Sequence, residues 1–131
     1  MRVIVCVDDS LGMLFAGKRQ SRDSRVLDDI KNHFEPIVIL PFSEKLLSSS
    51  GVKYTVKNSI NDVCDTETVF IESIDPASLE GKIDELILYK WNRRYPSDMR
   101  LTLDLKKFKK SSICEFTGTS HDKITREVYK K

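Results

Sequence analysis

The sequence predicts one α/β domain with a mixed, mostly parallel central sheet, flanked by helices and closed by a C-terminal antiparallel hairpin. In the first half of the chain, short apolar runs typical of buried strands alternate with helical patterns. Two alternating segments near the end, 111–116 and 124–129, are typical of an antiparallel pair. A chain of 131 residues suits one domain, so we expect a single unit over residues 1–131.

Hydrophobic patterns and helix caps give the expected order of elements. Strands are expected at residues 3–7, 36–40, 52–56, 68–72, 86–93, 101–105, 111–116 and 124–129, and helices at 24–32 and 43–49. The first strand is apolar on both faces and should be central. Residues 10–17 are expected to form a loop in which Met13, Leu14 and Phe15 either cover a pocket or pack inward.

A dense polar run separates the first strand from the first helix. Residues 18–23 read Lys-Arg-Gln-Ser-Arg-Asp between two segments that should be buried, and many folds place a site on such a segment. Arg19, Gln20, Ser21, Arg22 and Asp23 are therefore candidate ligand-binding residues. The alternative is a solvated loop in which Ser21 or Asp23 caps the helix.

The strand at 86–93 supplies a second group of candidates. Its alternation places Tyr89, Trp91 and Arg93 on one face. The indole of Trp91 could stack on a flat ligand, and nearby arginines could pair with phosphate or carboxylate. The alternatives are core packing for Trp91 and solvation for the arginines. In the functional interpretation, this face and the polar run line one cleft at the C-terminal ends of the strands.

Asp23 and His121 are the candidate acid and base. A histidine can titrate near neutral pH, which makes His121 a candidate acid. Its neighbours Ser120 and Asp122 do not indicate a catalytic triad, because all three lie on one loop and no oxyanion feature is evident.

Composition excludes several classes of protein. The formal net charge is only +2, so the overall field does not indicate nucleic acid. The chain has three cysteines, an odd number without CxxC spacing, at Cys6, Cys64 and Cys114. No signal-peptide pattern is present. We therefore expect a cytoplasmic protein with reduced thiols. With His33 and His121 as its two histidines, no metal site is expected. No apolar run approaches the roughly 20 residues of a membrane span.

Several stretches, in the correct order, resemble the dihydrofolate reductase family. They are CVDDSLGM at 6–13, the helix at 24–32, EPIVILPFSEKLL at 35–47, KIDELILYKWNRRYPSD at 82–98 and the closing pair of strands. The resemblance implies that family's fold, with the 86–93 strand beside the first strand. It also implies that Asp23, in the first turn of the first helix, faces the pterin side of a cleft.

The cofactor half of that family's site is not recognisable in this sequence. The family has a Gly-Arg pair after its second strand, where a helix N-terminus binds phosphate, and here Leu40, Pro41 and Phe42 occupy that place. A glycine pair that lets the family's backbone approach the pyrophosphate is replaced by Glu72 and Ser73, and a carboxylate would repel phosphate. We therefore expect no nicotinamide cofactor and no NADPH-dependent reductase activity.

A second resemblance is to short bacterial proteins that often carry the label ribonuclease Z. They share a VDDxxGMLF…RQSRD opening, a WNRxYPSD stretch and a GxSHxKIT ending, found here at 7–23, 91–98 and 118–125. The HxHxDH zinc signature of that enzyme is absent from this chain, so zinc-dependent ribonuclease activity is not expected.

The leading functional interpretation is a reductase-like domain that has lost its dinucleotide site. It would bind a small flat or anionic ligand, a nucleotide or a nucleic-acid segment, without redox chemistry. The first alternative is a nucleotide- or RNA-processing enzyme that uses Asp23 and His121. The second is a protein-interaction module, with self-association through Met13, Leu14 and Phe15.

Overall fold

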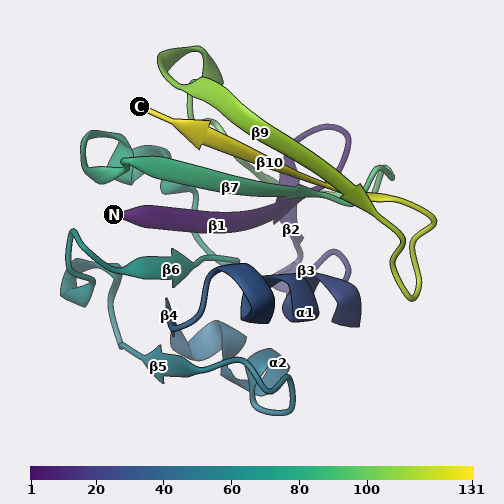
Figure 1. Cartoon of the computed structure of the whole chain (residues 1–131), viewed down its shortest axis with the longest axis horizontal. Helices are drawn as coiled ribbons and strands as arrows, with labels where there is room; N and C mark the ends of the chain where they lie inside the picture. Colours follow the sequence, from purple (N-terminus) through teal and green to yellow (C-terminus); the bar gives the residue numbers. More distant parts are fainter.

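A seven-stranded mixed sheet forms the centre of the computed structural model, which describes all 131 residues. Its strands, in spatial order, are β5 (Tyr54–Val56), β4 (Ile37–Ile39), β6 (Thr68–Phe70), β1 (Arg2–Val7), β7 (Glu85–Lys90), β10 (Ile124–Lys130) and β9 (Lys109–Phe116). The first five run parallel to one another, whereas β10 is antiparallel to both β7 and β9 (Figure 1). The predicted fold class and the closing antiparallel pair are both confirmed.

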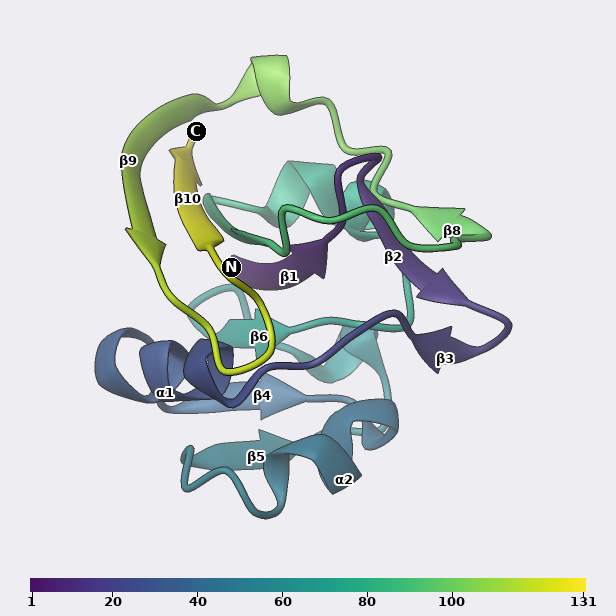
Figure 2. The same ribbon diagram turned by 90° about the vertical axis from the view of Figure 1, so that its right-hand side faces the viewer.

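β1 is the central strand because its side chains are apolar on both faces. Val3, Val5 and Val7 enter one hydrophobic cluster, and Ile4 enters the other. Alternate residues of a strand point to opposite faces, so a continuous apolar run must be covered on both sides. The sheet is accordingly sandwiched between two layers of other elements, as the view along the strands shows (Figure 2).

One layer is the helix α1 (Ser24–His33), which buries Val26 and Ile30 against the Ile4 face of the sheet. The opposite layer contains a three-stranded sheet and a 3-10 helix. Their bounds are β2 (Gly12–Phe15), β3 (Lys18–Arg19), β8 (Met99–Arg100) and η3 (Pro76–Lys82). The short elements η1 (Pro41–Ser43), α2 (Glu44–Leu47), η2 (Ile60–Asp62) and η4 (Leu105–Lys107) complete the fold. None of the helices combines the length and the apolar character of a membrane-spanning segment.

Two expectations from the sequence are corrected here. The segment 10–17 is not a loop, because β2 pairs antiparallel with both β3 and β8. Met13 and Leu14 are buried and Phe15 alone is largely exposed, at 48%, so this hairpin does not present a three-residue contact surface. The segment 101–105 is not a strand, although its leucine alternation reflects real burial of Leu101 and Leu103.

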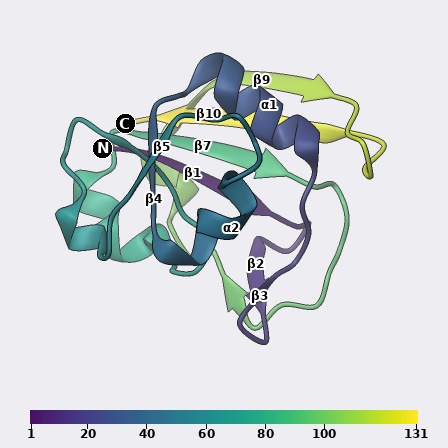
Figure 3. The same ribbon diagram turned by 90° about the horizontal axis from the view of Figure 1, so that it is seen from below.

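The C-terminal ends of the parallel strands meet at one edge of the main sheet. The polar run 18–23 passes this edge and leads into α1, and the loop between β9 and β10 lies beside the start of α1 (Figures 2 and 3). The predicted cleft region therefore brings together segments from opposite ends of the sequence.

Candidate functional site

Asp23 joins the start of α1 to the β9–β10 loop. It is the helix N-cap, as predicted, and its carboxylate accepts six hydrogen bonds: from the N–H groups of Arg25, Thr119 and Ser120, from the hydroxyls of Thr119 and Ser120, and from His121 Nδ1. Burial alone would raise the pKa of this carboxyl, but these donors outweigh burial and hold its pKa well below the ordinary value. The side chain has no exposed surface, so its carboxylate is committed to the protein and does not face a ligand.

His121 is held on all sides by its neighbours. Its Nδ1 lies 2.9 Å from Asp23 Oδ2, and its Nε2 lies 3.1 Å from Ser21 Oγ and 2.9 Å from the Tyr95 hydroxyl. The imidazole stacks on the Trp91 indole, with ring centroids 4.7 Å apart and an interplanar angle of 23°. These contacts make His121 a buried member of a hydrogen-bonded chain, rather than a surface histidine.

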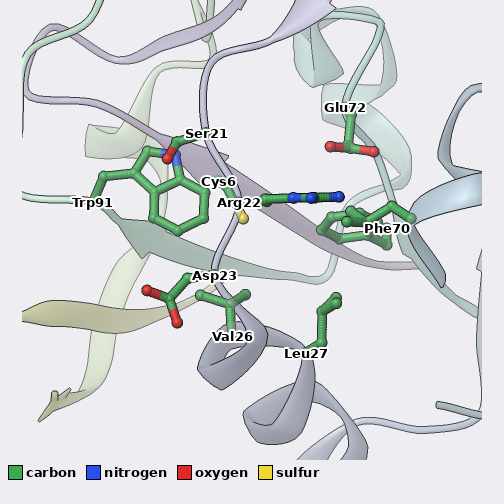
Figure 4. A pocket seen from close by; sticks show the side chains of 10 residues that line it. Cys6, Ser21, Arg22, Asp23, Val26, Leu27, Phe70, Glu72 and Trp91 are labelled. Carbon is green, nitrogen blue, oxygen red and sulfur yellow. The ribbon is translucent and has the colours of Figure 1, made fainter. Parts of the chain in front are cut away.

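A small inner cavity lies below the polar run. Its volume is about 20 Å³, room for roughly one water molecule. Ten residues line it: Cys6, Ser21, Arg22, Asp23, Val26, Leu27, Leu46, Phe70, Glu72 and Trp91 (Figure 4). Burial raises the pKa of the Cys6 thiol, and the Glu72 carboxylate adds to this effect. Cys6 therefore lines the cavity as an uncharged thiol.

Arg19 and Gln20 lie at a neighbouring cavity of about 10 Å³, which shares Ser21, Glu72 and Trp91 with the first. The guanidinium of Arg19 donates two 2.8 Å hydrogen bonds to the Glu72 carboxylate. Glu72 also accepts a 2.7 Å hydrogen bond from the buried Ser43 hydroxyl. The bidentate bond to Glu72 raises the pKa of Arg19, and Arg19 is therefore already paired.

A larger open cleft lies outside the inner cavity, between α1, α2 and the β9–β10 loop. Its volume is about 430 Å³, and it is lined by Arg22, Asp23, Ser24, Leu27, Leu46, Ser49, Thr119 and Ser120. The carbonyl of Arg22 accepts a hydrogen bond from Ser120, whereas its guanidinium has no hydrogen-bond or ion-pair partner in the protein. Figure 4 shows the Arg22 side chain extended across the inner cavity.

The structure brings together most of the residues proposed from the sequence, but not all of them. Ser21, Arg22, Asp23 and Trp91 share the inner cavity, and Arg19 and Gln20 lie at its neighbour. Trp91 is only 4% exposed and belongs to the core, so the core-packing alternative describes it better than an open stacking floor.

Tyr89 and Arg93 do not share this site. Tyr89 is completely buried and donates a 2.6 Å hydrogen bond to Asp29. Arg93 is exposed and lines neither cavity nor the cleft. β7 ends at Lys90, and Asn92 then adopts a left-handed φ of 59°. This turn breaks the strand alternation on which the shared face of Tyr89, Trp91 and Arg93 depended.

Several residues of the site were not predicted. Tyr95 belongs to the YPSD turn, and Thr119 and Ser120 come from the loop that also carries His121. Their hydroxyls give no pattern in sequence, because Thr119 and Ser120 lie 96 and 97 positions from Asp23, and Tyr95 lies 26 positions from His121. Leu27 and Leu46 were assigned only to helices, and the spacing of their apolar neighbours could have placed them beside the cleft.

No three histidine, cysteine, aspartate or glutamate side chains lie together in a way that could hold a metal ion.

Comparison with known proteins identifies the fold. No protein-family model matches the chain, and no curated protein matches it in sequence. Among solved structures, a dihydrofolate reductase from Enterococcus faecalis, complexed with NADP(H) and RAB-propyl, superposes with a TM-score of 0.74 over 98% of this chain and 94% of the other, at 13% sequence identity. The label ribonuclease Z receives no support from this comparison. The chain is therefore a single α/β domain with the dihydrofolate reductase fold.

Proposed function

We propose that this protein binds a small anionic ligand with a flat apolar part in the open cleft between α1 and α2, without nicotinamide redox chemistry. The observation that carries this proposal is the Arg22 guanidinium, because Arg22 lines the cleft and its guanidinium has no hydrogen-bond or ion-pair partner in the protein. An arginine in that state can form charge-assisted, bidentate hydrogen bonds to a phosphate or carboxylate.

The remaining lining of the cleft suits such a ligand. Leu27 of α1 and Leu46 of α2 give it apolar walls that could enclose a ring. The hydroxyls of Ser24, Ser49 and Ser120 line the same space and could orient polar substituents. A volume of about 430 Å³ lies within the usual range for small-molecule sites. A nucleoside monophosphate, with one planar base and one phosphate group, matches these features in size and charge.

We further propose that the protein does not use a nicotinamide dinucleotide. In support, Glu72 lies two residues after the end of β6, and its carboxylate is held there by Arg19 and Ser43. Pro41 begins η1 and offers no N–H group, and α2 is only four residues long with Glu44 in its first turn. These groups do not fit a pyrophosphate, which needs free N–H donors and positive potential.

A single free arginine favours a small ligand over a nucleic-acid chain. Nucleic-acid binding sites neutralise several phosphates with clustered basic residues. Arg19 is paired with Glu72 and Arg93 is remote from the cleft, so Arg22 has no second free arginine beside it there. A nucleic-acid segment is therefore the weaker form of the proposal.

Isothermal titration calorimetry with guanosine 5′-monophosphate and with folic acid tests the proposal. At least one of these probes should bind the wild type, and Arg22→Ala should weaken binding about tenfold or more, because a hydrogen bond to a charged group contributes roughly 1.5–3 kcal/mol. Arg25→Ala is the matched control, since Arg25 is exposed in the first turn of α1 and lines neither the cleft nor the cavities. Equal loss of binding in both variants, or no binding of either probe, would contradict the proposal.

A further inference from the structure

We propose that Ser21 is a nucleophile, activated by His121 as general base, and that the protein transfers a small acyl group from a carboxylic ester to water. Asp23 acts as a positioning residue in this scheme. The proposal goes beyond ligand binding and does not depend on which ligand occupies the open cleft.

The three side chains form a hydrogen-bonded series in the order that nucleophilic catalysis requires. Asp23 Oδ2 lies 2.9 Å from His121 Nδ1, and His121 Nε2 lies 3.1 Å from Ser21 Oγ. Because the Asp23 carboxylate accepts from Nδ1, that nitrogen carries the proton and Nε2 presents its lone pair to the hydroxyl. Ser21 and His121 are 100 positions apart in the sequence, so the series is a product of the fold.

The imidazole is fixed in orientation, as a base in this role must be. It is 3% exposed, stacks on Trp91 and cannot turn without breaking its bond to Asp23. The Tyr95 hydroxyl also lies 2.9 Å from Nε2 and competes with Ser21 for the same lone pair. Removing the Tyr95 hydroxyl should leave Ser21 as the one donor to Nε2.

Ser21 is placed where a substrate could reach it. It is half-buried and lines both small cavities, and the inner one shares Arg22, Leu27 and Leu46 with the open cleft. The exposed Arg22 side chain lies across the inner cavity, so rotation of this side chain would connect that cavity with the cleft. The inner cavity has room for roughly one water molecule, so an acyl group as small as acetyl would fit only with the Arg22 side chain turned away. The main-chain N–H groups of Ser21 and Arg22 have no partner within the protein, and they are candidate donors to the oxyanion.

The reaction balances with water as the second substrate. Ser21 Oγ attacks the ester carbonyl carbon while its proton passes to His121 Nε2, and the bond from that carbon to the alcohol oxygen breaks. The leaving alcohol takes the proton from Nε2. Water then attacks the acyl-serine, its proton passes to Nε2, and Ser21 leaves and recovers the proton as the carboxylic acid departs.

Methanesulfonyl fluoride tests the nucleophile, because it is small and transfers its sulfonyl group to an activated serine with loss of fluoride. Wild-type protein should gain one sulfonyl group, and peptide mass spectrometry should locate it on Ser21. Ser21→Ala should abolish labelling, whereas Ser78→Ala, at an exposed serine of η3, should not change it. Tyr95→Phe should label faster than wild type, because the competing hydroxyl at Nε2 is removed, an effect that a purely structural role for the cluster does not produce.

Hydrolysis of p-nitrophenyl acetate gives a second readout. The wild type should exceed the buffer rate, and His121→Gln should lower its rate at least about 100-fold if the imidazole acts as general base. Circular dichroism checks that each variant is folded, and the labelled position in wild type needs no variant at all. An unlabelled wild type, a label on another residue, or hydrolysis unchanged in Ser21→Ala would overturn the proposal.

Discussion

Replacing Asp23 with asparagine tests the most tightly connected side chain of the site. The carboxylate oxygens divide six donors equally: Oδ1 accepts from the N–H of Arg25 and from the N–H and hydroxyl of Thr119, and Oδ2 accepts from the N–H and hydroxyl of Ser120 and from His121 Nδ1. Asparagine has nearly the same shape, so the change alters hydrogen bonding and charge with little effect on packing.

The size of the effect follows from these contacts. If the amide oxygen takes the Oδ1 position, the amide nitrogen faces the donors at Oδ2. The Ser120 hydroxyl can rotate and His121 can exchange its ring proton, but the Ser120 N–H cannot adapt and is left opposite another donor. One buried donor left unsatisfied costs about 1–3 kcal/mol, and the loss of charge weakens the other bonds. We expect Asp23→Asn to lower the free energy of unfolding by about 2–4 kcal/mol.

Urea unfolding at pH 7, followed by the fluorescence of Trp91, measures this difference, because Trp91 is the single tryptophan and stacks on His121. Asp122→Asn, at an exposed aspartate of the same loop, is the matched control and should change stability by less than about 0.5 kcal/mol. An Asp23→Asn variant as stable as this control would refute the reasoning.

The low pKa of Asp23 also predicts that the stability difference between wild type and Asp23→Asn depends on pH. The pKa of Asp23 is lower in the folded protein than in the unfolded chain. Its contribution is therefore fully present above the ordinary aspartate pKa of about 3.9 and is lost as the pH falls below that value. The stability advantage of wild type over Asp23→Asn should shrink as the pH falls below about 4.

Three further predictions concern the burial of Trp91, the close packing at Gly118 and the binding of NADPH. Trp91→Ala should cost about 3–5 kcal/mol of stability, measured by circular dichroism in urea, because the indole is a core side chain; a loss below about 1 kcal/mol would contradict its placement. Gly118→Ala should cost about 1–3 kcal/mol by overpacking, because an added Cβ would collide with the Asp23 carboxylate, whereas Gly81→Ala, whose Cβ would meet nothing within 4 Å, should be close to neutral. If the protein does not use a nicotinamide dinucleotide, as proposed, NADPH fluorescence should not change on titration with protein, because the Glu72 carboxylate would repel a phosphate; micromolar binding would count against this.

Sequence patterns predicted the main sheet and α1 because each of these elements has a strong local signal. The continuous apolar run of β1 indicated a central strand, and Asp23 before an amphipathic segment indicated a helix cap; both predictions are confirmed. The small sheet was missed because β2 and β3 are short and follow left-handed turns at Leu11 and Ala16, where φ is 63° and 51°. Neither residue type favours that conformation, and Gly17, whose φ is 73°, was the single turn signal between β2 and β3.

The candidate site was only partly predictable, since its chemistry depends on contacts between distant segments. The polar run drew attention to Ser21 and Asp23, and titration drew attention to His121. The sequence could not indicate that Asp23 would be saturated by the β9–β10 loop, or that Glu72 would pair with Arg19. These pairings depend on tertiary placement, which strand alternation and helical periodicity do not encode.

A two-dimensional ¹H–¹⁵N NMR titration with guanosine 5′-monophosphate and folic acid tests the central claim, a small-anion site at the open cleft, most directly. The account predicts chemical-shift changes concentrated on the cleft residues Arg22, Ser24, Ser49, Thr119 and Ser120, weakened by added salt because the charge pairing is screened. Changes confined to another surface, or no change with either probe at millimolar concentration, would contradict it.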